Sequence, residues 1–271
     1  MKTYCLTIYN ENFNFFKKLK LIPVGLGNAK FSRKWLNDKN GLNIAKKNSF
    51  YGEYTFHYNM WKNNLIKKND KNWIGFCTYR RFWVKKKKII STYKELEENI
   101  LKFVPRQWDG YESILASPIK IKKIKKIKII KNAFIEIIKN PYLFFKTKQN
   151  IKDHFYIFHG SNFLDESVKL LKFNEKKEFI NFLNKDSFNP HNLFFCKNNQ
   201  ILKEYYNSLF NWLDLCENKF GFEGLTGYGK IRIYGFLAER YLCFWFNKYT
   251  KSRAWPISYF DTNKFPNLKV L

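Results

Sequence analysis

The order of apolar and polar positions predicts strands in the first half of the chain and mainly helices in its last third. Residues 2–9 (KTYCLTIY), 73–78 (WIGFCT), 111–116 and 192–196 are rich in β-branched and aromatic residues, as buried strands are. Longer stretches with helical spacing predict helices at 51–64, 92–103, 165–173, 174–183, 200–217 and 233–248. Thr92 and Glu95 also have the spacing of a capping box. Strands that alternate with helices favour an α/β domain with a largely parallel sheet and a helical C-terminal part.

The segment 119–148 has a pattern of its own. Ile121, Ile124, Ile127 and Ile130 stand between lysines, and more apolar residues follow. A helix here would carry an apolar face rimmed by lysine, the profile of a segment that lies in a membrane interface. The threefold spacing drifts around a true helix, so a solvated helix packed on the domain is the alternative.

Composition bounds the class of protein. With 271 residues, of which 45% are hydrophobic and 20% aromatic, the chain can bury a core, and we expect one domain over residues 1–271. The formal net charge of +28 favours an anionic partner such as membrane lipid, nucleic acid or a phosphorylated substrate. A general composition bias toward Lys, Asn, Ile and Phe, as an AT-rich genome would produce, explains the same excess without a partner.

Cysteine usage and the missing apolar runs indicate the compartment. The five cysteines are scattered, odd in number and without a CxxC pair, which favours buried free thiols; they are Cys5, Cys77, Cys196, Cys216 and Cys243. No apolar run reaches the roughly 18 residues that a membrane span requires, and the first residues lack the apolar core of a signal peptide. We therefore expect a cytoplasmic protein, soluble or peripheral on the inner face of the membrane.

Two short motifs could bind phosphate. Arg80 and Arg81 follow the predicted strand 73–78, and open α/β sheets bind ligands at the carboxyl ends of their strands. Guanidinium groups match phosphate oxygens, although alternation along a strand would let only one of the two arginines reach the ligand. The turn at Gly25, Gly27 and Asn28 could offer backbone N–H groups. A salt bridge and a plain turn are the structural alternatives.

Ionisable side chains supply candidate acids, bases and sugar ligands. The acids are Glu53, Asp153, Asp165, Glu166 and Glu239, and Glu239 lies beside Arg240 in an apolar helix, where it needs a partner or a function. The histidines are His57, His154, His159 and His191, and none has the spacing of a metal site. The chain contains no Asp-x-Asp motif, through which many sugar transferases bind a divalent cation, so no metal ligands are predicted. A cofactor such as Mn²⁺ or Mg²⁺ is therefore not firmly implied. An arginine could neutralise a diphosphate instead.

The ordered motifs resemble a bacterial capsular-polysaccharide biosynthesis family that is filed as a domain of unknown function and regarded as glycosyltransferases. The matching segments are 22–27 (IPVGLG), 43–44, 47–48, 51–58 (YGEYTFHY), 61–63, 73–82 (WIGFCTYRRF), 154–155, 158–160, 188–192 (FNPHN) and 232–240 (RIYGFLAER). Together they run from about residue 20 to 248. Thr78 departs from the pattern, since many members carry histidine there, and any role of that histidine does not transfer.

The resemblance implies a single GT-A-like domain that transfers a sugar from a nucleotide-sugar donor to a capsular polysaccharide or lipopolysaccharide acceptor, which is expected to be lipid-linked. The expected donor-binding residues are Gly25, Gly27, Asn28, Asn63, Tyr79, Arg80 and Arg81. The expected catalytic acids are Glu53, Asp165 and Glu239. Acceptor or sugar contacts are expected from His57, His154, His159, His191, Asn192 and Arg240. An anionic membrane surface, through 119–148, is the expected further partner.

Two other functions fit parts of the sequence. A nucleic-acid-binding protein would use the high charge and the aromatic residues for stacking, but no recognisable module supports it and nucleic acid is not the expected partner. A transferase of a non-sugar substituent to the same polysaccharide would share the motifs.

Overall fold

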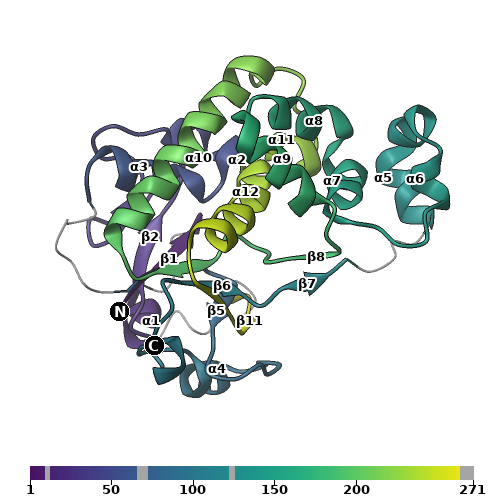
Figure 1. Ribbon diagram of the computed structural model, residues 1–271. Coiled ribbons are helices and arrows are strands. Elements are labelled where there is room, and N and C mark those ends of the chain that lie inside the picture. The colour runs from purple at the N-terminus through teal and green to yellow at the C-terminus, as the bar shows by residue number, and fades with distance from the viewer. Residues whose placement is uncertain (10–12, 66–72, 122–125, 263–271) are drawn as a thin grey trace.

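A computed structural model describes residues 1–9, 13–65, 73–121 and 126–262 (Figure 1). Within these residues nine strands form one sheet: β1 (Lys2–Thr7), β2 (Ile22–Gly25), β3 (Leu36–Asn37), β4 (Ile74–Thr78), β5 (Arg81–Trp83), β6 (Ser113–Ala116), β9 (Phe194–Cys196), β10 (Ser252–Trp255) and β11 (Ile257–Tyr259). The main strand order is β10-β6-β9-β4-β1-β2-β3. A separate two-stranded ladder joins β7 (Ile119–Lys120) to β8 (Ser187–Phe188).

The sheet is mostly parallel, as the sequence predicts. β1 pairs in parallel with both β2 and β4, and β10 pairs in parallel with β6. β9 is the exception at the centre, because it runs antiparallel to its neighbours β4 and β6. β5 turns back on β4, and β11 pairs antiparallel with β5.

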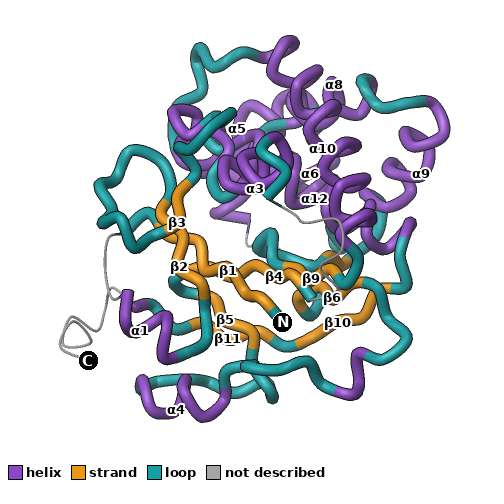
Figure 2. Tube along the Cα trace, turned by 90° about the vertical axis from the view of Figure 1, so that its left-hand side faces the viewer, coloured by secondary structure: helices purple, strands orange, loops and turns teal. Residues whose placement is uncertain are grey.

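Helices cover both faces of the sheet (Figure 2). Their bounds are α1 (Phe13–Lys18), α2 (Asn48–Tyr51), α3 (Tyr54–Lys62), α4 (Tyr93–Asn99), α5 (Lys126–Lys139), α6 (Tyr142–Phe145), α7 (Ile151–His159), α8 (Ser161–Lys169), α9 (Phe173–Leu183), α10 (Asn199–Phe220), α11 (Tyr228–Ile231) and α12 (Ile233–Tyr249), with 3₁₀ turns at Ala45–Lys47 and Arg106–Trp108. The larger layer, with α3, α10 and α12, lies on one face, and α1 and α4 lie on the other. This arrangement is the α/β fold with a more helical C-terminal part that the sequence predicts.

Alternation along the central strands divides the core in two. Leu6 and Phe76 face the cluster built from α3, α10 and α12, whereas their chain neighbours Cys5 and Cys77 face the cluster with α1 and α4. Both faces of β1 and β4 are therefore buried, which explains their nearly continuous apolar runs. All five cysteines are free and buried, as expected from the sequence.

Local signals set several helix boundaries. The hydroxyl of Thr92 accepts the backbone N–H of Glu95, and the Glu95 side chain accepts the N–H of Thr92, so the predicted capping box starts α4. An equivalent box of Asn150 and Asp153 starts α7, a helix that the periodicity did not predict. α12 is buried on nearly every side, which explains its uninterrupted apolar sequence.

The lysine-rich segment differs from the single helix expected over 119–148. Ile119–Lys120 forms β7, and residues 122–125 lie outside the described part of the chain. α5 is interrupted at Ala133, whose backbone is non-helical, and Pro141 separates it from the short α6. Of the residues that the structure describes, none belong to a helix long and apolar enough to cross a membrane.

Candidate active site

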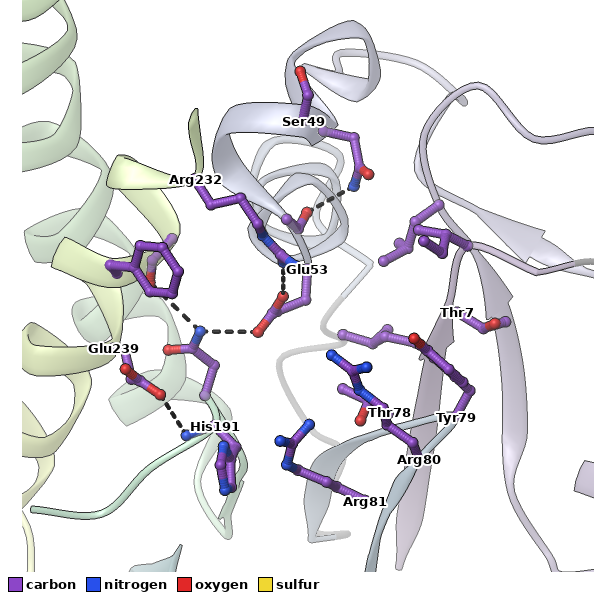
Figure 3. Close-up of a pocket in the computed structure, with 18 of the residues that line it drawn as sticks. Thr7, Ser49, Glu53, Thr78, Tyr79, Arg80, Arg81, His191, Arg232 and Glu239 are labelled. Carbon is purple, nitrogen blue, oxygen red and sulfur yellow. Dashed lines mark hydrogen bonds and ion pairs between the residues drawn. The ribbon is translucent and has the colours of Figure 1, made fainter. Parts of the chain in front are cut away.

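A cavity of about 300 Å³ opens where the parallel strands β1 and β4 end. This first cavity is bounded on the opposite side by the segment between α2 and α3 and by the start of α12 (Figure 3). Its wall consists of Leu6, Thr7, Ile8, Leu26, Asn48, Ser49, Gly52, Glu53, Thr78, Tyr79, Arg80, Arg81, His191, Asn192, Tyr228, Arg232, Gly235, Phe236 and Glu239. The carboxyl ends of parallel strands are where open α/β sheets bind their ligands.

Two arginines enter the first cavity side by side. Arg80 lies in the tight turn after β4, and Arg81 is the first residue of β5. Both line the cavity, because strand alternation, which favoured one arginine at the ligand, does not apply to a residue in a turn. Neither forms an ion pair with a residue that the structure describes. Burial, and then the charge of Arg80, lower the pKa of Arg81.

Two carboxylates face these arginines from the other side. Glu53 lies between α2 and α3, and it accepts hydrogen bonds from Asn192 Nδ2 at 2.9 Å and Arg232 Nη2 at 2.9 Å. Glu239 lies on α12, where its Oε1 accepts the backbone N–H of His191 at 2.6 Å and its Oε2 pairs with Arg240. Each carboxylate thus keeps a cationic partner of its own, which leaves Arg80 and Arg81 for a ligand.

The segment before β9 brings two predicted residues into the same wall. His191 and Asn192 both have left-handed backbone angles, with φ of 76° and 55°. Such conformations are uncommon outside glycine and often occur at functional sites. Burial, followed by the charges of Arg81, Arg80 and Arg240, lowers the pKa of His191 to about 3. His191 is therefore neutral at physiological pH and can donate or accept a hydrogen bond in the cavity.

Arg232 and Tyr228 are cavity residues that our residue-by-residue prediction missed. Arg232 lies between α11 and α12 and reaches Glu53, which is 179 positions away in sequence. Gly52 makes room for it, because a Cβ at this position would lie 2.1 Å from Arg232 Nη2. The only sequence signal was that Arg232 opens one of the matched motifs.

A second, larger cavity of about 680 Å³ adjoins the first. The two share four wall residues, His191, Tyr228, Phe236 and Glu239. The rest of the second wall is largely apolar and aromatic, and it includes Ile119, Phe158, Phe188 and Pro190. Glu239 consequently lies at the junction of the two cavities.

Three further predicted residues line the second cavity. His154 contacts Arg240 Nη2 at 3.2 Å, and burial, then the charge of Arg240, lowers the pKa of His154 to about 3. His159 bonds the carbonyl of Gly229 at 2.8 Å and stacks on Phe236. Arg240 itself is only 1% exposed and lies over the rings of Phe155 and Phe188.

In the glycine turn predicted to bind the donor, Gly25, Gly27 and Asn28 do not line the first cavity. The N–H of Gly27 donates to both carboxylate oxygens of the buried Asp38, at 3.1 and 3.2 Å. Gly25 packs so closely that a Cβ would lie 2.3 Å from the ring of Phe31, and Asn28 is exposed. From this turn the neighbouring Leu26 lines the cavity.

Three other predicted site residues lie outside both cavities and make structural contacts. Asn63 bonds the backbone of Leu42 through both ends of its amide and so fastens a loop to α3. His57 is fully buried among aromatic rings and bonds the hydroxyl of Tyr206 at 2.8 Å. Asp165 accepts the hydroxyl of Tyr156 at 2.6 Å and is 46% exposed. The structure brings none of these three to either cavity.

The donor set of the first cavity does not resemble a metal site. Both of its carboxylates are bonded to arginines, and the groups left for a ligand are mainly cationic. In the described ranges no group of three or more His, Cys, Asp or Glu side chains could hold a metal ion. The cavity is thus better suited to an anion than to a cation.

Comparisons with known proteins agree with this fold. The bifunctional glycosyltransferase WbbM, solved in its apo form, superposes with a TM-score of 0.72 and 18% identity, over 96% of this chain. The chain spans 45% of the length of WbbM. No curated protein matches the sequence. The chain therefore has a glycosyltransferase fold, and the likeness at this identity concerns the fold alone.

A family model matches residues 5–251, nearly the whole described chain. The match includes every residue of the first cavity wall named above. The protein belongs to the family described as "Domain of unknown function (DUF4422)".

Proposed function

We propose that the protein is a glycosyltransferase that takes a sugar from a nucleotide-sugar donor. One observation carries the proposal: Arg80 and Arg81 line a cavity at the carboxyl ends of the parallel strands and have no carboxylate partner among the described residues. The glycosyltransferase fold supports it.

The donor would bind with its diphosphate against these arginines. The first cavity holds three arginines, Arg80, Arg81 and Arg232, against two carboxylates, so its formal charge is positive before a ligand enters. A guanidinium group can bond two phosphate oxygens at once and stays charged at all relevant pH values. As the bond to the sugar breaks, negative charge grows on the departing diphosphate, and fixed cations stabilise it there. On this proposal the arginines take the neutralising role that a divalent cation has in other enzymes.

The acceptor would reach the sugar from the second cavity, with Glu239 as the base. Glu239 lines both cavities, whereas Glu53 lines only the first. In the proposed inverting step, Glu239 takes the proton of the acceptor hydroxyl while that oxygen bonds the anomeric carbon. The bond from this carbon to the diphosphate breaks with its electron pair left on the phosphate oxygen.

The acceptor that we infer is a capsular polysaccharide or lipopolysaccharide intermediate carried on lipid at the inner face of the membrane. Aromatic walls in the second cavity suit the flat apolar faces of sugar rings. Neutral His154 and His191 would orient sugar hydroxyls as donors or acceptors. The free buried cysteines are compatible with a reducing, cytoplasmic location.

Thermal shift with a panel of nucleotides and nucleotide-sugars tests the donor proposal. A ligand that binds the native state raises the melting temperature by mass action. We expect one nucleotide diphosphate class to stabilise the protein, with and without EDTA, and the double variant R80Q/R81Q to lose this effect. The matched control R33Q/R106Q removes two exposed arginines that do not line the cavity, and it should keep the effect.

Three results would count against the proposal. Stabilisation by oligonucleotides but by no nucleotide-sugar would favour a nucleic-acid-binding protein. Stabilisation that disappears with EDTA would refute the role given to the arginines. Transfer of a non-sugar group from the stabilising donor would replace the glycosyl reaction with another transfer.

A further inference from the structure

Helices α5 and α6 form an arm at one side of the molecule, away from the central sheet (Figure 1). We call residues 126–148 the α5–α6 arm. Large apolar side chains lie exposed along it, and they are Ile127, Ile130, Phe134, Ile135, Ile138, Tyr142 and Phe145. Phe134, Ile138 and Phe145 are 61%, 66% and 69% exposed. Exposed apolar residues gathered in this way mark an interaction surface.

The opposite face of the arm is fixed to the protein. Ile129, Ala133 and Leu143 are buried and form a small core with Ile157 of α7. This core is separate from the two clusters on the faces of the sheet. The arm thus has its own packed side, and its exposed apolar side is not needed to hold it in place.

The segment that contains the arm is strongly basic in sequence. Residues 119–148 contain ten lysines and one acidic residue, Glu136. Glu136 is 13% exposed and lies 3.9 Å from Lys139, so it adds little negative charge to the surface. Lys126, Lys139 and Lys148 are exposed at the ends of α5 and beyond α6. An exposed apolar face in a lysine-rich segment fits a bilayer with anionic headgroups.

Other occupants fit this surface less well. Nucleic acid would use the lysines but leave seven large apolar side chains in water. A second copy of the chain would bring two lysine-rich arms together, and their charges would repel. An anionic lipid surface satisfies the apolar face and the charge together.

We propose that the α5–α6 arm docks the protein on an anionic lipid bilayer, with its apolar side chains at the level of the headgroups. Along the chain, the arm lies between residues that line the second cavity. Ile119 of that cavity precedes the arm, and His154 and Phe158 follow it on α7. Docking would hold the second cavity close to the membrane, where a lipid-linked acceptor is found; this consequence rests on the proposed function, whereas the lipid binding does not.

Vesicle sedimentation tests the docking. The full chain is mixed with phosphatidylglycerol-containing vesicles or with phosphatidylcholine vesicles, and the variant F134Q/I138Q is compared with the wild type. The matched control F173Q/I89Q replaces two apolar side chains that are 83% and 87% exposed elsewhere on the surface. Because all four residues are exposed, both variants should keep the wild-type melting temperature.

We expect the arm variant to lose about tenfold or more in its partition onto anionic vesicles, and the control to change little. Binding should weaken as salt is raised and should be much lower on phosphatidylcholine. Equal losses in both variants, or equal binding to both kinds of vesicle, would overturn the proposal. Self-association lost only in the arm variant, without vesicle binding in the wild type, would assign the surface to a second copy.

Failure of this inference can be told from failure of the proposed function. Thermal shift by the donor is measured on the same two variants in the absence of lipid, and it should be unchanged. If the protein binds vesicles through the arm but binds no donor, the docking proposal stands and the glycosyltransferase proposal fails. Donor binding without vesicle binding would do the reverse.

Discussion

Replacing Gly52 by alanine should disturb the first cavity through a single methyl group. Gly52 follows α2 with φ of 59° and ψ of −133°, a conformation that residues with a side chain rarely adopt. Its added Cβ would lie 2.1 Å from Arg232 Nη2 and 3.1 Å from Arg232 Cζ. The alanine would therefore strain the backbone and also push Arg232 away from Glu53.

Gly221 separates these two costs, because it has the same place in its helix and nearly the same backbone. It follows α10 with φ of 60° and ψ of −150°, but a Cβ there meets nothing within 4 Å. The backbone strain should cost about 1–3 kcal/mol in either variant, less about 0.4–1 kcal/mol from the stiffer unfolded chain. G52A should lose roughly a further 1 kcal/mol, since the Glu53–Arg232 pair is partly screened by water.

Urea unfolding of the two variants measures the difference. The free energy of unfolding in water, from linear extrapolation, should be lower for G52A than for G221A by roughly 1 kcal/mol. In an R232A background this difference should vanish, because the methyl group then has no guanidinium to displace. Donor stabilisation should fall in G52A and not in G221A.

Equal destabilisation by G52A and G221A would refute the role given to Arg232. So would a difference between the two that persists in the R232A background. The first result would mean that Arg232 can bend away from the methyl group and still bond Glu53. The second would mean that the extra cost in G52A does not come from Arg232.

Three further predictions concern chemistry, donor binding and pH. E239Q should lower kcat by about 10²–10⁴ in a sugar-transfer assay with unchanged donor affinity, whereas the exposed control E178Q should retain activity. R81K should raise the donor Kd by roughly tenfold in calorimetry, because lysine cannot bond two phosphate oxygens in a plane. Burial lowers the pKa of His57 to about 3. Below about pH 6.5 the histidine of the unfolded chain therefore binds a proton that the folded chain does not bind, so the free energy of unfolding should fall as the pH drops. H57Q should reduce that slope in urea titrations at successive pH values by about one proton, roughly 1.4 kcal/mol per pH unit, and an unchanged slope would contradict this account.

Periodicity predicted the elements whose burial is uniform along their length. β1 and β4 are buried on both faces, so their apolar runs are visible in the sequence alone. α10 and α12 are long enough for their patterns to stand out. α7 was missed because three polar residues and then four apolar residues follow one another along it without helical spacing, and only its capping box marks its start.

Some residues of the candidate site could also be identified from the sequence, and others could not. Arg80 and Arg81 could be chosen from the sequence because they directly follow a recognisable strand, and the end of such a strand is where ligands bind. Gly25 and Gly27 could not be judged, because whether a backbone N–H is free depends on a distant acceptor such as Asp38. Asp165 had the right chemistry but lies on α8, outside both cavities.

The sequence by itself determined the buried strands β1 and β4, the long helices α10 and α12, the burial of the cysteines, and which charges stand at the end of β4. Those features depend on neighbours within a few residues, whose spacing records which side of an element is buried. Only the tertiary structure decided that β9 runs antiparallel, and that Glu53 meets Asn192 and Arg232 across 139 and 179 positions. Contacts over such separations arise from the packing of the whole chain, and no local pattern contains them.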